Sequence, residues 1–142
     1  MAEKEDLLKK IAEEAIPFHK FLGVEVLELK DGFCKIRIPL REEIIGDPRF
    51  KRWHGGVIAT AMDSAGGMVA MMTLASGKEK VATIDLRIDY LRGTSPTDLV
   101  VNGYLVRSGN RVIAARMEAY QENEEKLVAE GRAMFSVYRE EK

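Results

Sequence analysis

The feature that most constrains the fold is the run 57–75, in which Asp63 is the only ionisable side chain. A helix with no charged face must be covered on most sides, by protein or by lipid. A carboxylate at the centre of a bilayer costs about 2.5–3.5 kcal/mol, which disfavours a membrane span. We therefore expect a central helix over 54–76 that is surrounded by protein, and no association with a membrane.

Length and composition indicate a soluble globular protein. The chain has 142 residues, of which 46% are hydrophobic and 32% are charged, and its formal net charge is -1. We expect a single domain over 1–142 with its own core. Charges of both signs are interspersed, which leaves no basic face for a nucleic acid. Cys34 has no partner for a disulfide. Charged residues among the first ten positions leave no apolar signal segment, so we expect a cytoplasmic protein.

Strand patterns follow the central helix. Apolar and polar residues alternate strictly over 81–90, which predicts a half-exposed strand with Thr83 on its polar face and Ile84 on its apolar face. Three more strands are expected at 98–107, 111–121 and 127–138, joined by turn-like residues. The four strands are expected to form an antiparallel meander.

A helix and two strands are expected before the central helix. Apolar spacing predicts a helix within 1–20, strands cover 24–29 and 33–40, and 41–53 reads as a loop. This order predicts an α+β fold, in which an antiparallel sheet of about six strands wraps around one long central helix.

Motifs along nearly the whole chain resemble those of hotdog-fold thioesterases. They are Pro17-Phe18, Leu22-Gly23, Gly46-Asp47-Pro48, His54-Gly55-Gly56, Asp63, Thr83 and Tyr90-Leu91-Arg92. The chain is similar to the phenylacetate-pathway-type acyl-CoA thioesterases of the 4-hydroxybenzoyl-CoA thioesterase-like superfamily. The resemblance implies hydrolysis of an aryl- or short/medium-chain acyl-CoA by a homodimer, often assembled into a homotetramer.

Helix geometry separates His54 from Asp63. At about 1.5 Å and 100° per residue, the two lie about 13 Å apart along the axis and on opposite faces. They cannot meet within one chain, so a site that uses both must combine two subunits, most simply in a two-fold dimer. The resemblance implies the same arrangement, with the helix N-terminus of one subunit facing the acid of its partner.

Gly55 and Gly56 are expected to leave the first backbone N–H groups of the helix open, at the positive end of its dipole. Such donors suit a thioester carbonyl that becomes an oxyanion. The resemblance assigns this role mainly to Gly55, with His54 positioning the thioester. The alternative is that the glycines only allow close packing and that His54 caps the helix.

Asp63 is the expected general base or nucleophile, and the residues leave both roles open. The alternative is a structural acid paired with Arg87 or Arg116. By resemblance, Thr83 orients the attacking water. Asp47 stands where the family commonly has asparagine, and an ionised aspartate cannot donate a hydrogen bond. Asp47 therefore points away, retains its proton, or marks a different handling of the substrate.

Other residues are candidates for contacts with the substrate. The acyl group could be lined by Met62, Met68, Met71, Met72, Phe50 and Trp53, although such methionine clusters are more often core. By resemblance, the pantetheine arm runs beside the strand that carries Ala82 and Thr83. Gly56 and Arg92 are further candidates, Arg92 for the nucleotide end.

Two other functions stay open from the sequence. The same fold serves non-catalytic acyl-CoA-binding regulatory modules, and it also serves dehydratases that act on hydroxyacyl thioesters. The two histidines, His19 and His54, lack neighbouring ligands at metal-site spacing, so we expect no metal and no cofactor. His19 is expected to cap or pack near the end of the N-terminal helix.

Overall fold

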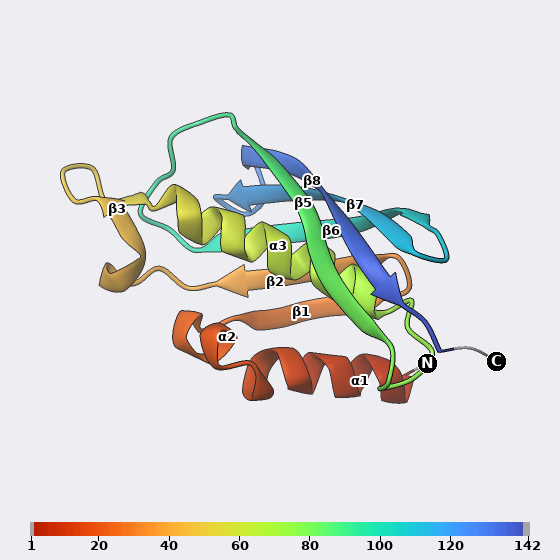
Figure 1. The fold of residues 1–142 in the computed structure, drawn as a ribbon. Coiled ribbons are helices and arrows are strands. Elements are labelled where there is room, and N and C mark those ends of the chain that lie inside the picture. The colour runs from red at the N-terminus through yellow and green to blue at the C-terminus, as the bar shows by residue number, and fades with distance from the viewer. Residues whose placement is uncertain (1, 141–142) are drawn as a thin grey trace.

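The computed structural model describes residues 2–140, which form helices and strands around one core. The elements are α1 (Ala2–Lys10), the π-helical turn η1 (Ile11–Ala15), α2 (Pro17–Leu22), β1 (Glu25–Lys30), β2 (Phe33–Ile38), the 3-10 turn η2 (Glu42–Ile44), β3 (Ile45–Asp47), β4 (Arg52–Trp53), α3 (Gly55–Met71), β5 (Lys80–Tyr90), β6 (Leu99–Ser108), β7 (Val112–Gln121) and β8 (Lys126–Tyr138). Six strands form an antiparallel sheet in the order β1-β2-β6-β7-β8-β5 (Figure 1). The predicted α+β architecture is confirmed.

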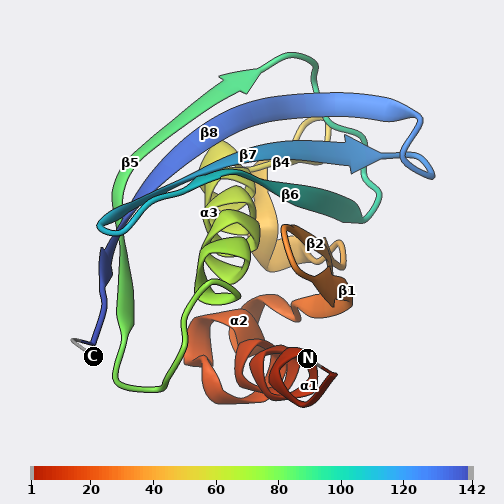
Figure 2. The same ribbon diagram turned by 90° about the vertical axis from the view of Figure 1, so that its right-hand side faces the viewer.

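The sheet curls over α3, which lies along its inner face (Figure 2). Alternate residues of β8, among them Ala133 and Phe135, point inward and are buried against this helix together with Ala65 and Val69. Because the sheet covers α3 on one side and the N-terminal helices approach it from another, the helix needs no charged face. Within residues 2–140, no helix is both long enough and apolar enough to cross a membrane.

The two predicted helices are shorter than expected. The segment 1–20 is not one helix, because Ile16 has an extended backbone (φ -88°, ψ 111°) before Pro17, which begins α2. A residue before proline is pushed out of the helical region, which explains the break. The central helix ends at Met71 instead of 76, and the carboxylate of Glu79 accepts a hydrogen bond from the Ala75 N–H in the loop that follows.

The strand order corrects the predicted meander. Strands β6, β7 and β8 are consecutive neighbours, but β5 pairs with β8 at the edge of the sheet and not with β6. Both edges of β6 are already occupied, by β2 and β7. The expected loop over 41–53 also contains the short β3–β4 pair, in which Ile45 lies opposite Trp53.

A β-bulge in β5 corrects the predicted faces of that strand. Thr83 lies opposite Phe135 and Asp85 opposite Met134, so Ile84 is the extra residue. One inserted residue reverses the alternation of side chains. Thr83 therefore faces α3, as Leu86 does after the bulge, while Ile84 is 58% exposed.

Candidate active site

Asp63 lies on α3 and faces the bulge of β5. Its Oδ1 accepts a hydrogen bond of 2.9 Å from the Thr83 hydroxyl. Both residues line a cavity of about 190 Å³ between α2, α3, β5 and β8, together with Ile16, His19, Ser64, Gly67, Met68, Met71, Val81 and Phe135. The bulge thus gives the half-buried carboxylate a polar neighbour in a mostly apolar cavity.

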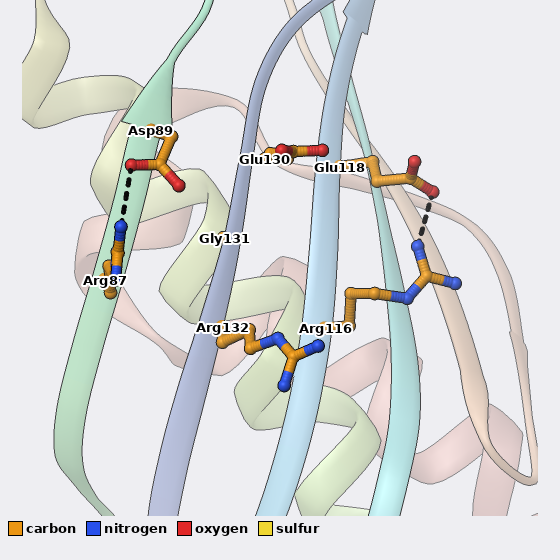
Figure 3. Close-up of a pocket in the computed structure, with 7 residues that line it drawn as sticks. All are labelled: Arg87, Asp89, Arg116, Glu118, Glu130, Gly131 and Arg132. Carbon is orange, nitrogen blue, oxygen red and sulfur yellow. Dashed lines mark ion pairs between the residues drawn. The ribbon is translucent and has the colours of Figure 1, made fainter.

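Neither arginine proposed as a partner for Asp63 reaches it. Arg87 pairs with Asp89 at 3.5 Å, and Arg116 pairs with Glu118 at 3.0 Å. Both pairs border a depression on the opposite side of the sheet from α3 (Figure 3). Within residues 2–140, Asp63 therefore forms no ion pair, and the structural-acid alternative loses its proposed partners.

The N-terminus of α3 forms a second group of polar atoms. His54 is the N-cap, and its Nδ1 accepts a hydrogen bond of 2.9 Å from the Gly56 N–H. This corrects the expectation that both glycine N–H groups are open, although it confirms His54 as a cap. Within residues 2–140, no carbonyl or side chain accepts from the Gly55 N–H. One donor therefore remains for a ligand at the positive end of the helix.

Tyr90, at the end of β5, holds the first turn of α3 from outside. Its hydroxyl donates a hydrogen bond of 2.7 Å to the Gly55 carbonyl, and burial raises the pKa of this phenol above its ordinary value. A Cβ added at Gly55 would lie 3.6 Å from the Tyr90 ring, which is ordinary contact. The alternation in β5 indicated an apolar position for Tyr90 but gave no indication of this contact.

One chain keeps the two groups of polar atoms apart. His54 and Gly55 do not line the cavity that contains Asp63 and Thr83. This agrees with the separation expected from helix geometry. A reaction that uses both groups needs a second chain.

Asp47 is bonded to its own loop. Its carboxylate accepts hydrogen bonds from the side chain and the backbone N–H of Arg49, and the side-chain bond is the larger cause of a lowered pKa. The lowered pKa of Asp47 disfavours a retained proton, one of the three expected explanations. The carboxylate is held as a hydrogen-bond acceptor for Arg49.

Two predicted substrate contacts are core residues instead. Met62 has no exposed surface, and Trp53 is 5% exposed with its indole N–H donating to the Thr97 carbonyl. Of the other methionines, Met68 and Met71 line the cavity, whereas Met72 is buried outside it.

The remaining candidates lie at the surface. Ala82 is exposed on β5, and Arg92 is exposed just beyond the end of this strand. Phe50 is 58% exposed in the β3–β4 loop, where the guanidinium groups of Arg49 and Arg52 lie over its ring. None of these three side chains lines the cavity with Asp63.

His19 and Ser64 are site residues that the sequence did not reveal. His19 is 8% exposed, with Nδ1 3.0 Å from the Ala12 carbonyl oxygen and Nε2 2.9 Å from the Ser64 hydroxyl. Both line the cavity beside Asp63. The only available indication was that Ser64 follows Asp63, because nothing local shows that α2 folds back onto α3.

Comparisons with known proteins converge on one family. The model of the thioesterase superfamily matches residues 50–128. The medium/long-chain acyl-CoA thioesterase YigI of Escherichia coli K12 is 32% identical, over 94% of this chain and 95% of its own. Its counterpart in Salmonella typhimurium is 30% identical, over 84% of this chain and 87% of its own. A solved protein from Shewanella oneidensis, related to the thioesterase superfamily, superposes with a TM-score of 0.85 at 28% identity, covering 95% of each chain.

Proposed function

We propose that this chain, which belongs to the thioesterase superfamily, hydrolyses the thioester bond of an acyl-CoA at a site centred on Asp63. The observation that carries the proposal is the position of Asp63 in a cavity, bonded to Thr83 and paired with no cation within residues 2–140. A carboxylate in this position can take a proton from water or attack a carbonyl itself.

The carbonyl of the thioester needs donors, and the Asp63 cavity has few to offer. The free Gly55 N–H at the start of α3 is such a donor, and the helix dipole adds to its effect. Because one chain separates Gly55 from Asp63, the proposed site takes Asp63 from one subunit and Gly55 from its partner. A two-fold dimer then has two equivalent sites.

His54 supports the same end of the site. Its Nδ1 accepts from the Gly56 N–H, so a neutral ring carries its hydrogen on Nε2. The cap thus fixes one tautomer and leaves an N–H donor that can reach the thioester or its acyl group. Because Asp47 is held by Arg49 as an acceptor, we assign it no bond to the oxyanion.

For the acyl group we propose an aryl or medium-length chain. The cavity beside Asp63 is lined by apolar side chains of α3, β5 and β8 and by Ile16, which precedes α2. The relatives named medium/long-chain acyl-CoA thioesterases support this range at its longer end. The exposed Arg92 stays the candidate for the nucleotide phosphates.

The test is release of free thiol from a panel of acyl-CoAs, from acetyl to palmitoyl with phenylacetyl and benzoyl, followed with a thiol-reactive dye. We expect turnover by the native protein that Asp63→Asn lowers by at least about 100-fold. Asp85→Asn is the matched control, because it removes an exposed carboxylate from β5. Burial raises the pKa of Cys34 to about 12, so the folded protein itself should not consume dye.

The alternatives give different results in the same assay. Tight binding of an acyl-CoA without turnover would indicate a regulatory module, and hydration of an enoyl thioester would indicate a dehydratase. Light scattering should show a dimer or a tetramer in every active preparation. For the natural protein we expect the cytoplasm, where Cys34 stays reduced.

A further inference from the structure

The N-terminal segment is hydrogen-bonded to α3 beside Asp63. His19 Nδ1 lies 3.0 Å from the Ala12 carbonyl oxygen, which can only accept, so Nδ1 carries the ring hydrogen. In the neutral ring Nε2 is then an acceptor, and it lies 2.9 Å from Ser64 Oγ. With the ring neutral, the Ser64 hydroxyl donates its single proton to His19.

The hydrogen bond to His19 determines whether Ser64 Oγ can donate or accept a hydrogen bond in the cavity. With its proton committed to His19, Oγ can only accept from a third group. Thr83 is in the same state, because its hydroxyl proton is donated to Asp63. An ionised carboxylate also only accepts. The cavity thus contains acceptor oxygens of three residues, Asp63, Ser64 and Thr83. A ligand that forms hydrogen bonds with these oxygens must be a donor.

Water is such a ligand, because it brings two O–H donors. The thioester carbonyl is not, because its oxygen accepts. We propose that Ser64 Oγ, held as an acceptor by His19, is a second anchor for the attacking water beside Asp63, and that His19 is a positioning residue. The inference rests on the proposed function and deepens it by assigning Asp63 the role of base.

The reaction balances without further groups. One water proton passes to Asp63 as the water oxygen forms the new C–O bond, and the second water O–H stays bonded to Ser64. Collapse of the tetrahedral intermediate breaks the C–S bond, and the thiolate takes its proton from Asp63. Ser64 and His19 keep their own protons throughout, so neither is consumed or covalently changed.

Four variants test the arrangement in the dye assay. Ser64→Ala should lower kcat about tenfold and change KM less than about twofold, as expected for one lost hydrogen bond to the reacting water. His19→Phe keeps an aromatic ring but removes the acceptor, so it should match Ser64→Ala. His19→Gln restores an acceptor oxygen and should recover most of kcat. Thr73→Ala is the control, because that hydroxyl bonds to the Ala70 carbonyl outside this cavity.

Competition between water and hydroxylamine for the thioester distinguishes a loss of water positioning from a loss of structure. With hydroxylamine present, Ser64→Ala should form a larger fraction of hydroxamate than the native protein, because its water is held less well. Unchanged kcat in folded Ser64→Ala, or a lower kcat with native partitioning, would overturn the inference. If Asp63→Asn still abolishes turnover in that case, the proposed function stands. If the native protein hydrolyses no acyl-CoA in the panel, the proposed function fails as well.

Discussion

Replacing Gly55 with proline tests the role of the helix N-terminus with little disturbance of the fold. Gly55 is the first residue of α3, a position where proline is well tolerated because its N–H has no intrahelical partner. His54 has φ -65° and ψ 129°, which is the region that a residue before proline prefers. The nearest atoms to an added Cβ belong to the Tyr90 ring, at 3.6 Å. The substitution therefore removes one donor and leaves the helix start in place.

The expected loss follows from the value of one oxyanion donor. Gly55→Pro should lower kcat about 10²- to 10³-fold, equivalent to about 2.7–4 kcal/mol of transition-state stabilisation. Gly55→Ala keeps the N–H and should stay within about threefold of native, and the free energy of unfolding of both variants should lie within about 1 kcal/mol of native. Steady-state thiol release and urea unfolding measure the two quantities. A Gly55→Pro protein with native kcat would refute the reasoning.

Three further outcomes are expected. Thr83→Val should lower kcat about tenfold through loss of the bond to Asp63, while Thr83→Ser stays near native in the same assay. Gly131→Ala should destabilise the fold by about 1–3 kcal/mol in urea, because its Cβ would lie 2.4 Å from the Arg87 carbonyl oxygen and β5 would have to move. The pKa of Glu79 is lowered, chiefly by the hydrogen bond from the Ala75 N–H. The stability that this carboxylate adds to the folded state is therefore complete above the pKa of Glu79 in the unfolded chain, and it is lost as the pH falls through the lower pKa of the folded state. The gap in urea midpoint between native and Glu79→Gln should therefore shrink between about pH 6 and pH 3, and a gap that widens would contradict this assignment.

The elements that could be predicted from the sequence are those with a strong local pattern. The run around Asp63 without other charges identified α3, alternation identified β5, and the turn-like residues between them marked β6, β7 and β8, each strand within a residue or two of its bounds. Local patterns could not predict which strand pairs with β5. Strand order depends on which edges are free, and only the assembled sheet shows that β8 offers its edge to β5.

The residues of the candidate site could be named from the sequence, but their contacts could not be predicted. Alternation placed Thr83 on the polar face, yet a bulge at Ile84, which no residue pattern announces, turns its hydroxyl to Asp63. The bond between His19 and Ser64 spans 45 positions, so no local pattern could reveal it. Trp53 stands next to the helix cap in sequence but packs into the core.

The most direct test of the account is activity in a mixed dimer that carries Asp63→Asn in one subunit and Gly55→Pro in the other. Two affinity tags on co-expressed chains allow the mixed dimer to be isolated from both parents. If each site takes Asp63 from one subunit and Gly55 from its partner, one of the two sites contains both native residues. The account predicts about half of the native turnover per dimer, far above either parent. A mixed dimer no more active than the average of the two parents would contradict a shared site.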